Sequence, residues 1–389
     1  MVVWNSAMTA YNFGPGHPMA PERMDLTARL AKSLGLLDLA HVSVAAPEVA
    51  TDAELETVHS PEFVAAVRRV SADPGAPDEA RGLGTEDDPA FAGMHEAAAR
   101  LAGGSLLAAN AILDESALHA VNFGGGMHHA ARERASGFCI YNDSAVAIQR
   151  LLDGGVDRVA YIDLDAHHGD GTESIFWNEP RVLTVSLHES GLTLFPGTGF
   201  ANETGGPQAE GTAVNVALPS GTGDAGWLRA FYAVVPQLMG AFQPEVIVSQ
   251  HGCDSHRHDP LAHLNISVDG QREAAIAVGN LAARHCGGRW IATGGGGYSV
   301  TDVVPRAWSH LIAIAAGRPV PLRTEVPNDW RAYVLAKFGR DAPELMGDDV
   351  ELWWRSWEVG FDPNDAVDRT VMATRKAVFP FHGLDPWFD

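Results

Sequence analysis

The segment 161–176, YIDLDAHHGDGTESIF, concentrates carboxylates and imidazoles directly after an apolar run. Asp165 and His167 are one residue apart, so in an extended backbone their side chains point to the same side. A carboxylate oxygen and an imidazole nitrogen placed in this way can share one metal ion. Asp254, in QHGCDSHRHDP after the apolar run EVIVS, is the natural third ligand.

An Asp, His, Asp set leaves a coordination position open for water and substrate, as a catalytic zinc needs. Because two of the three ligands are oxygens, Fe²⁺ or another divalent ion also suits this set. An isolated D-x-H is more typical of a surface turn with hydrogen-bonded polar groups. The presence of Asp254 after a second strand favours the metal site.

A second group is the pair His128 and His129 in NFGGGMHHA, again after an apolar run. Adjacent imidazoles with carboxylate partners can take and return a proton near neutral pH. Asp163 and Asp170 are available to orient them and to raise their basicity. Histidine pairs without a function are common on surfaces, but the glycines at 124–126 let the backbone turn sharply near a ligand.

A third group is TGGGGY, residues 293–298. Four glycines are compatible with a phosphate cradle, but no Lys-Ser/Thr follows them and the dinucleotide pattern G-x-G-x-x-G is incomplete. The run therefore favours a flexible loop that presents the Tyr298 hydroxyl to a developing oxyanion. The alternative is a tyrosine that only caps the core.

These groups need a scaffold that brings strand ends together. Short β-branched runs alternate with longer Ala- and Leu-rich amphipathic segments, which predicts an α/β domain with a parallel sheet flanked by helices. In such sheets, active sites form at the carboxyl ends of the strands. The expected strands are 117–123, 157–164, 181–188, 245–251 and 289–293, and the expected helices are about 91–113, 142–153, 226–241, 270–286 and 302–316.

Composition narrows the partners and the compartment. Lys and Arg number 27 against 49 Asp and Glu, which gives a net charge of −22. This charge argues against nucleic acid as a binding partner and favours a cationic peptide or metabolite. The alternative is that the acidic surface serves only solubility. Three scattered cysteines, Cys139, Cys253 and Cys286, are typical of a reducing compartment. With no leader-like start and no membrane-spanning run, we expect a cytoplasmic protein.

The character of the chain changes near residue 317. A Pro-rich stretch leads into a segment with five of the ten tryptophans. We expect a catalytic domain over 1–316 and a C-terminal extension over 317–389 that packs on it. An independent partner-binding module is the alternative.

Seven blocks together resemble the zinc-dependent histone deacetylase superfamily, and most of all its acetoin-utilisation branch, the AcuC-type deacetylases. The resemblance spans about residues 10 to 315 and implies the arginase/deacetylase fold, a single domain with an eight-stranded parallel sheet and helices on both faces. The blocks are HPMAPERM (17–24), NFGGGMHHA, GFCIYND (137–143), YIDLDAHHGDGT, SLHESGLTLFPGTG (186–199), HGCDSHRHDPLAHL (251–264) and TGGGGY.

The resemblance implies that Asp165, His167 and Asp254 hold zinc. It further implies catalytic roles, in which His129, oriented by Asp170, acts as general base and then general acid. His128, paired with Asp163, gives electrostatic support, and Tyr298 polarises the amide carbonyl. The expected reaction is removal of acetyl or short acyl groups from lysine in an acetylated protein or peptide, such as an acyl-CoA synthetase.

Substrate-binding positions follow from the same blocks. Phe138 and Phe195 match the aromatics of a narrow acyl-lysine channel, with Gly137 beside them and Leu261 at the rim. Two further positions match the rim carboxylate that holds the substrate backbone and the arginine of the pocket where acetate departs; these are Asp87 and Arg23.

The family also binds structural potassium. An inner site matches Asp163, Asp165, His167, Ser186 and Leu187. An outer site matches Phe176 and Val182, but the chain departs from the family's usual residues at the two other positions of that site, Glu179 and Thr212.

Three other functions stay open on the sequence. An acetylpolyamine deacetylase of the same fold suits an acidic protein, although such enzymes place an acidic gatekeeper where Leu261 stands. A binuclear manganese ureohydrolase needs a further metal-binding aspartate where Gly252 stands. A catalytically silent acyl-lysine binder would typically have lost a ligand, the histidine pair or the tyrosine.

Overall fold

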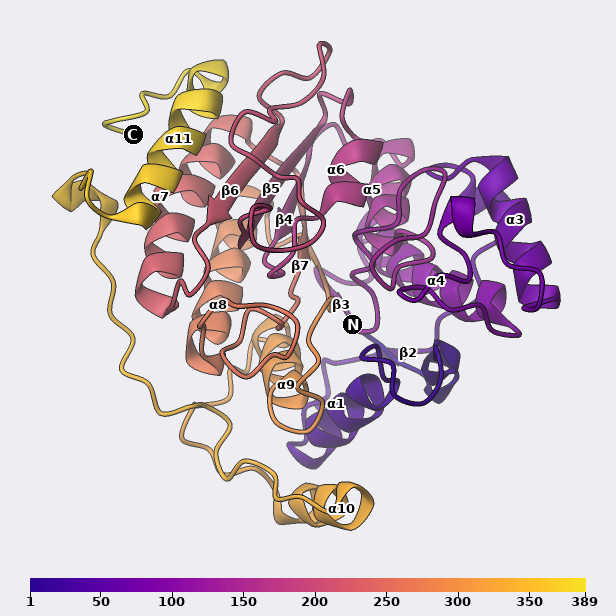
Figure 1. The fold of residues 1–389 in the computed structure, drawn as a ribbon. Helices are drawn as coiled ribbons and strands as arrows, with labels where there is room; N and C mark the ends of the chain where they lie inside the picture. The colour runs from indigo at the N-terminus through magenta and orange to yellow at the C-terminus, as the bar shows by residue number, and fades with distance from the viewer.

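The computed structural model describes residues 1–389. Its centre is one eight-stranded sheet in the order β2-β1-β3-β8-β7-β4-β5-β6, in which every strand pair is parallel (Figure 1). The strands are β1 Val2–Val3, β2 Val44–Ala45, β3 His119–Asn122, β4 Val159–Asp163, β5 Val182–Glu189, β6 Ala213–Leu218, β7 Val246–Gln250 and β8 Trp290–Thr293. The eight-stranded parallel sheet implied by the resemblance is confirmed.

The central strands are apolar and covered on both faces. All residues of β4 and β7 are buried, and their β-branched sequences suit a sheet that helices enclose. β4 lies between β7 and β5, in a register that places Asp163 beside both Gln250 and Ser186. Strands far apart in sequence therefore end next to one another.

Helices cover both faces of the sheet (Figure 1). On one side α4 packs on α5 and α3, and on the other α7, α8, α9 and α1 pack in series. Polar caps fix several helix starts; for example, the Asn142 side chain accepts from the Ala145 N–H at 2.9 Å where α5 begins. The helices are α1 Glu22–Ser33, α2 Asp52–Leu55, α3 Pro61–Ala72, α4 Met94–Leu113, α5 Asp143–Asp153, α6 Asp170–Ile175, α7 Asp224–Phe242, α8 Val268–His285, α9 Val304–Ala315, α10 Asn328–Phe338 and α11 Ala366–Val378.

The five strands and five helices expected from the sequence are all present, with bounds that differ by at most three residues at either end. The sequence patterns missed β1, β2 and β6 and the remaining helices. β1 and β2 are two residues long, which is too short for a periodic signal.

The C-terminal segment runs along the outside of the other elements from α10 to α11 (Figure 1). α11 packs on α7 and β6. There the buried Arg229 side chain donates to Asp368 at 2.7 Å and to the carbonyls of Arg355, Ser356 and Gly360. The division into 1–316 and 317–389 remains a prediction. None of the helices has the length and apolar character needed to cross a bilayer.

Candidate active site

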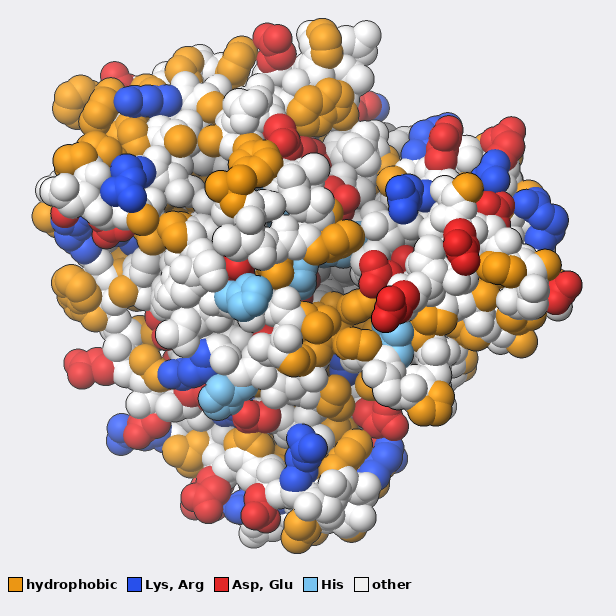
Figure 2. Space-filling model, viewed as in Figure 1, with side chains coloured by type: hydrophobic (Ala, Val, Ile, Leu, Met, Phe, Trp, Pro, Cys, Tyr) orange, Lys and Arg blue, Asp and Glu red, His pale blue; other side chains and the backbone are white.

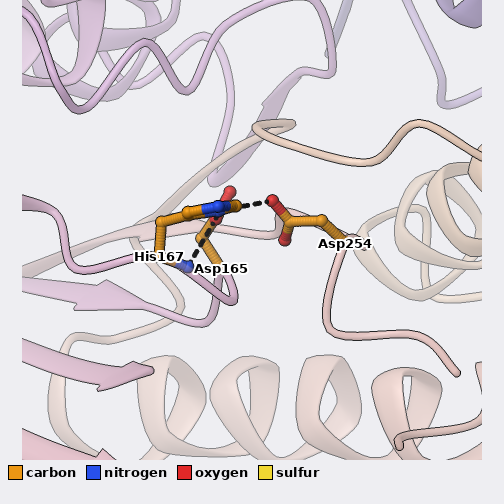
Figure 3. Close-up of side chains that lie close together, drawn as sticks. All are labelled: Asp165, His167 and Asp254. Atoms are coloured by element: carbon orange, nitrogen blue, oxygen red, sulfur yellow. Dashed lines mark hydrogen bonds and ion pairs between the residues drawn. The ribbon is translucent and has the colours of Figure 1, made fainter. Parts of the chain in front are cut away.

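Three buried side chains converge where β4 and β7 end side by side (Figure 3). His167 Nδ1 lies 3.1 Å from Asp165 Oδ1 and 3.0 Å from Asp254 Oδ2. Asp165 and Asp254 are at most 1% exposed, and His167 is 8% exposed. The structure thus brings together the three residues predicted as metal ligands.

The local reason for this convergence differs from the one expected. β4 ends at Asp163, and residues 165–167 form a bend, so strand alternation does not place Asp165 and His167. Instead the His167 N–H donates to Asp165 Oδ1 at 2.9 Å. The Ala166 N–H donates to Asp254 Oδ1, also at 2.9 Å. Backbone donors in the bend orient both carboxylates.

Glycines make room for the carboxylates. A Cβ on Gly252 would lie 1.9 Å from Asp165 Oδ2, and a Cβ on Gly296 would lie 2.0 Å from Asp254 Oδ2. The Gly296 N–H and the Gln250 side chain each donate to Asp165 Oδ2 at 2.8 Å. The glycine run after β8 therefore packs against the carboxylates of Asp165 and Asp254.

The buried carboxylates of Asp165 and Asp254 favour a bound cation. Burial and the neighbouring Asp165 raise the pKa of Asp254 above its usual range. Burial opposes a charge on His167, but Asp165 and Asp254 more than offset it and raise the pKa of His167 well above its usual value. Two buried carboxylates need a positive partner to offset their lost hydration. An O, N, O donor set fits a divalent ion such as Zn²⁺ or Fe²⁺.

The histidine pair lies against this group. His128 Nδ1 donates to Asp163 Oδ2 and His129 Nδ1 donates to Asp170 Oδ1, each at 2.7 Å. The two Nε2 atoms then face each other at 3.1 Å. Tyr161 also donates to Asp163 Oδ2, at 2.8 Å. Both predicted carboxylate partners are in place.

The two imidazoles differ in charge. Burial opposes protonation of His128, but Asp163 and Asp165 outweigh it and raise the pKa of His128 to about 9. Burial and then repulsion by His128 lower the pKa of His129 to about 4. Near neutral pH the pair holds one extra proton, and His129 is the neutral member that can accept another.

A cavity of about 210 Å³ leads from the surface to these groups. Figure 2 shows a hollow near the centre of this face, with histidine atoms inside it and apolar and acidic side chains around its mouth. Eight predicted site residues line the cavity, together with Leu194, which was not predicted. The lining residues are Asp87, His129, Gly137, Phe138, His167, Leu194, Phe195, Leu261 and Tyr298.

Tyr298 forms part of the cavity wall. Its ring packs edge-on against Phe138 with centroids 5.7 Å apart, and its N–H donates to Asp259 Oδ2 at 2.8 Å. Burial, and then Asp254, raise the pKa of Tyr298 well above its usual value. The phenol therefore keeps its proton and can act as a hydrogen-bond donor.

Arg23 lies behind the glycine run. Its buried guanidinium donates to the carbonyls of Gly295 and Gly297 at 2.8 to 3.1 Å. It also stacks over Trp308 at 5.0 Å and lies 5.6 Å from the centre of the Tyr298 ring. Arg23 thus fixes the loop that carries Tyr298; its role in acetate release stays a prediction.

The residues assigned to potassium form two groups, one around the end of β4 and one at the start of β5. Asp163 and Ser186 are neighbours in the sheet. At the other end of β5, the Phe176 carbonyl accepts from the Glu179 N–H at 2.9 Å, and the Val182 N–H donates to the Glu179 carbonyl at 3.1 Å. Both cation sites stay predictions, including the contribution of Leu187.

Sequence reasoning missed several supporting residues. Gln250 donates to the carboxylate of Asp165, a predicted metal ligand, and Asp259 holds the Tyr298 backbone. The buried Asp143 carboxylate accepts from the N–H groups of Gly126 and Met127, which fixes the turn before the histidine pair. A signal existed for Gln250, a polar residue that ends an apolar strand, but nothing local distinguished the others.

Three comparisons describe what the chain is similar to. Residues 17–315 match the sequence pattern described as the histone deacetylase domain. The chain is 43% identical over 346 residues to "Acetoin utilization protein AcuC" of Bacillus subtilis (strain 168), covering 88% of this chain and 87% of the relative. It is 39% identical over 336 residues to the protein of the same name in Staphylococcus aureus (strain MSSA476), covering 85% and 86%.

The fold matches solved structures as well. The crystal structure of an HDAC homolog from Aquifex aeolicus aligns with a TM-score of 0.82 and 28% identity, covering 96% of this chain and 99% of that one. The structure of an HDAC homolog complexed with SAHA aligns with the same values.

Proposed function

The chain belongs to the histone deacetylase family and is a deacetylase, and on this premise we propose that it hydrolyses acetyl or short acyl amides on the lysine ε-amine of proteins or peptides. The observation that carries the proposal is the cavity that His129, His167 and Tyr298 line between Phe138 and Phe195. A narrow, largely apolar passage to buried polar groups suits an unbranched side chain that ends in an amide.

We further propose that Asp165, His167 and Asp254 hold a zinc ion, which Fe²⁺ could replace. When bound, such an ion polarises the amide carbonyl and lowers the pKa of a water molecule. The two acidic ligands and the tight fit of Gly252 and Gly296 around them support this assignment. Structural potassium at the two sites near β5 is part of the same proposal.

The protein's own groups then move the protons. His129, neutral and held at Nδ1 by Asp170, accepts the proton of the attacking water at Nε2. His128, charged and paired with Asp163, lowers the energy of the negative charge that develops in the substrate. His129 then returns its proton to the nitrogen of the scissile amide, so that the C–N bond breaks and lysine leaves as a neutral amine.

Other residues bind and orient the substrate. Phe138 and Phe195 hold the methylene stem and exclude water, while the Tyr298 hydroxyl donates to the developing oxyanion. Asp87 is exposed at the rim, where a carboxylate can accept from the backbone N–H groups of the substrate. Arg23 is proposed to lie in the pocket through which acetate leaves and to bind acetate there.

An acetylpolyamine is the second candidate substrate, favoured by the net charge of −22 and by the exposed carboxylate of Asp87 at the channel mouth. The binuclear ureohydrolase is disfavoured because it needs an aspartate at position 252, and the structure leaves no room for a side chain there. A Cβ on Gly252 would lie 1.9 Å from Asp165 Oδ2. A silent binder is disfavoured because the ligands, both histidines and Tyr298 are all present.

The test compares turnover of an acetyl-lysine peptide with turnover of acetylputrescine, and measures metal per chain. We expect a higher kcat/KM for the peptide and one equivalent of a divalent metal. A higher kcat/KM for acetylputrescine would show that the substrate is an acetylpolyamine and not a peptide. Two equivalents of metal per chain would overturn the mononuclear site.

A further inference from the structure

Two buried histidines, His168 and His188, lie beside the candidate active site and take no part in the proposed chemistry. His168 follows His167 in the chain, and His188 lies in β5. Their rings pack with centroids 4.8 Å apart. Both rings contact one end of the Phe195 loop, which we define as residues 190–199, so they bear on a wall of the channel.

The contact is made at Thr198 and Gly199, and each histidine bonds one of them. His168 Nδ1 and the Thr198 hydroxyl share a hydrogen bond at 2.9 Å. His188 Nε2 donates to the Gly199 carbonyl at 2.9 Å. The fit is close, because a Cβ on Gly199 would lie 2.4 Å from His188 Nε2 and 2.6 Å from His168 Cγ. The end of the loop is therefore held by two hydrogen bonds and by direct packing.

The histidines are themselves held by regular elements. His168 Nε2 donates to Glu173 Oε2 of α6 at 3.2 Å, and the Asn215 side chain of β6 donates to the same oxygen at 2.7 Å. On β5, the Ser186 hydroxyl lies 2.7 Å from His188 Nδ1. All three partners are buried. Because they belong to α6, β5 and β6, the histidines tie the Phe195 loop to the sheet and to α6.

Phe195 depends on its backbone for its position. Its side chain is 43% exposed, so burial alone does not fix it, although its ring packs edge-on against His129 with centroids 5.0 Å apart. The loop is compact, since a Cβ on Gly191 would lie 2.7 Å from the Gly197 carbonyl carbon and 2.8 Å from the Thr198 nitrogen. A shift at Thr198 therefore reaches the whole loop, including Phe195.

We propose that His168 and His188 are positioning residues that hold one end of the Phe195 loop and so fix this wall of the substrate channel. The inference rests on the proposed function, in which Phe195 holds the methylene stem of the substrate. Neither histidine lines the cavity itself. Loosening their contact should therefore weaken substrate binding and leave the chemical step nearly unchanged, which raises KM and spares kcat.

Thr198→Val tests the hydrogen bond to His168. The change removes the hydroxyl and keeps the shape of the side chain, and because Thr198 is exposed it leaves the core intact. KM for an acetyl-lysine peptide should rise about 3- to 10-fold through the loss of one hydrogen bond, with kcat within about twofold and bound metal unchanged. Thr198→Ser is the matched control; it keeps the hydroxyl, and its KM should stay within about twofold of the wild type.

His168→Gln tests whether the effect of Thr198→Val acts through the histidine. The amide of Gln can still reach Glu173, but it presents no nitrogen at the position of Nδ1. In this background Thr198→Val should change KM by less than about twofold, because the hydrogen bond is already lost. A rise of about 3- to 10-fold on top of His168→Gln would show that Thr198 acts without His168, and would overturn the proposal.

A pair of glycine substitutions tests the packing against both rings. Gly197 and Gly199 have φ angles of +86° and +83°, so alanine is strained at each. Only at Gly199 would the added Cβ meet the histidines, since at Gly197 its nearest neighbour would be 3.8 Å away. Gly199→Ala should raise KM at least about tenfold more than Gly197→Ala. Equal effects would assign the change to backbone strain and contradict the role of the rings.

Hydrogen exchange of the Phe195 loop, measured by mass spectrometry, separates this proposal from the proposed substrate. Exchange in residues 190–199 should be about 3- to 10-fold faster in Thr198→Val and unchanged in Thr198→Ser. Unchanged exchange in Thr198→Val would overturn the proposal, whatever substrate is used. Faster exchange with an unchanged KM would overturn the link between the loop and the channel. Inactivity of all forms on the peptide, with faster exchange in Thr198→Val, would refute only the lysine substrate.

Discussion

If Asp165 holds the proposed metal, Gly252→Ala should weaken metal binding by displacing its carboxylate. The added Cβ would lie 1.9 Å from Asp165 Oδ2, whereas ordinary van der Waals contact begins at 3.4 Å. The carboxylate or the backbone must therefore move by about 1.5 Å, far beyond the ~0.2 Å tolerance of metal–ligand distances. Even the loss of a supporting contact lowers metal affinity about 10- to 100-fold, so displacing a ligand should cost at least ~100-fold, or about 2.7 kcal/mol.

Gly240→Ala is the matched control for this substitution. Gly240 lies in α7, and its Cβ would meet nothing within 4 Å. This change should stabilise the helix by up to about 1 kcal/mol and leave metal binding unchanged.

The assay is competition for zinc between each purified variant and a chromophoric chelator, with bound metal measured by elemental analysis. Circular dichroism would check that both variants fold. A Gly252→Ala protein that retains one zinc at the affinity of the wild type would refute the argument, because Asp165 could not then be a ligand in the geometry described.

Tyr298→Phe should lower kcat by about 10²- to 10³-fold with zinc retained, because it removes one donor to the oxyanion; unchanged turnover in a steady-state assay would exclude that role. Asp254→Ala should lose both metal and activity, and a variant that kept its zinc would place the third ligand elsewhere. Chelation should abolish activity and stoichiometric Zn²⁺ should restore it, whereas activity that survives exhaustive dialysis against chelator would contradict metal dependence. Asp368→Ala leaves Arg229 buried without its carboxylate partner and should lower the free energy of unfolding, measured in urea, by about 3–5 kcal/mol. A decrease below about 1 kcal/mol would show that other contacts hold the C-terminal segment.

Local sequence determined the layered fold and the motifs that meet at one edge of it. Apolar β-branched runs such as EVIVS indicate buried strands, and their alternation with amphipathic segments predicts a parallel sheet. Because strand ends of a parallel sheet meet at one edge, the polar residues that follow β3, β4, β7 and β8 were expected to gather there. The identity of the gathered groups then followed from residue type.

Tertiary structure decided how those groups face one another. Asp165 and His167 converge because residues 165–167 form a bend whose backbone N–H groups donate to carboxylates. The pattern of residue types in this segment predicted strand alternation and did not indicate the bend. Gln250 supports Asp165 only because β7 lies beside β4, and Arg229 pairs with Asp368 across 139 residues of chain. Contacts of this kind depend on which elements become neighbours. A local pattern of residue types fixes what each element is, whereas burial, charge compensation and the fit of side chains are properties of the packed interior.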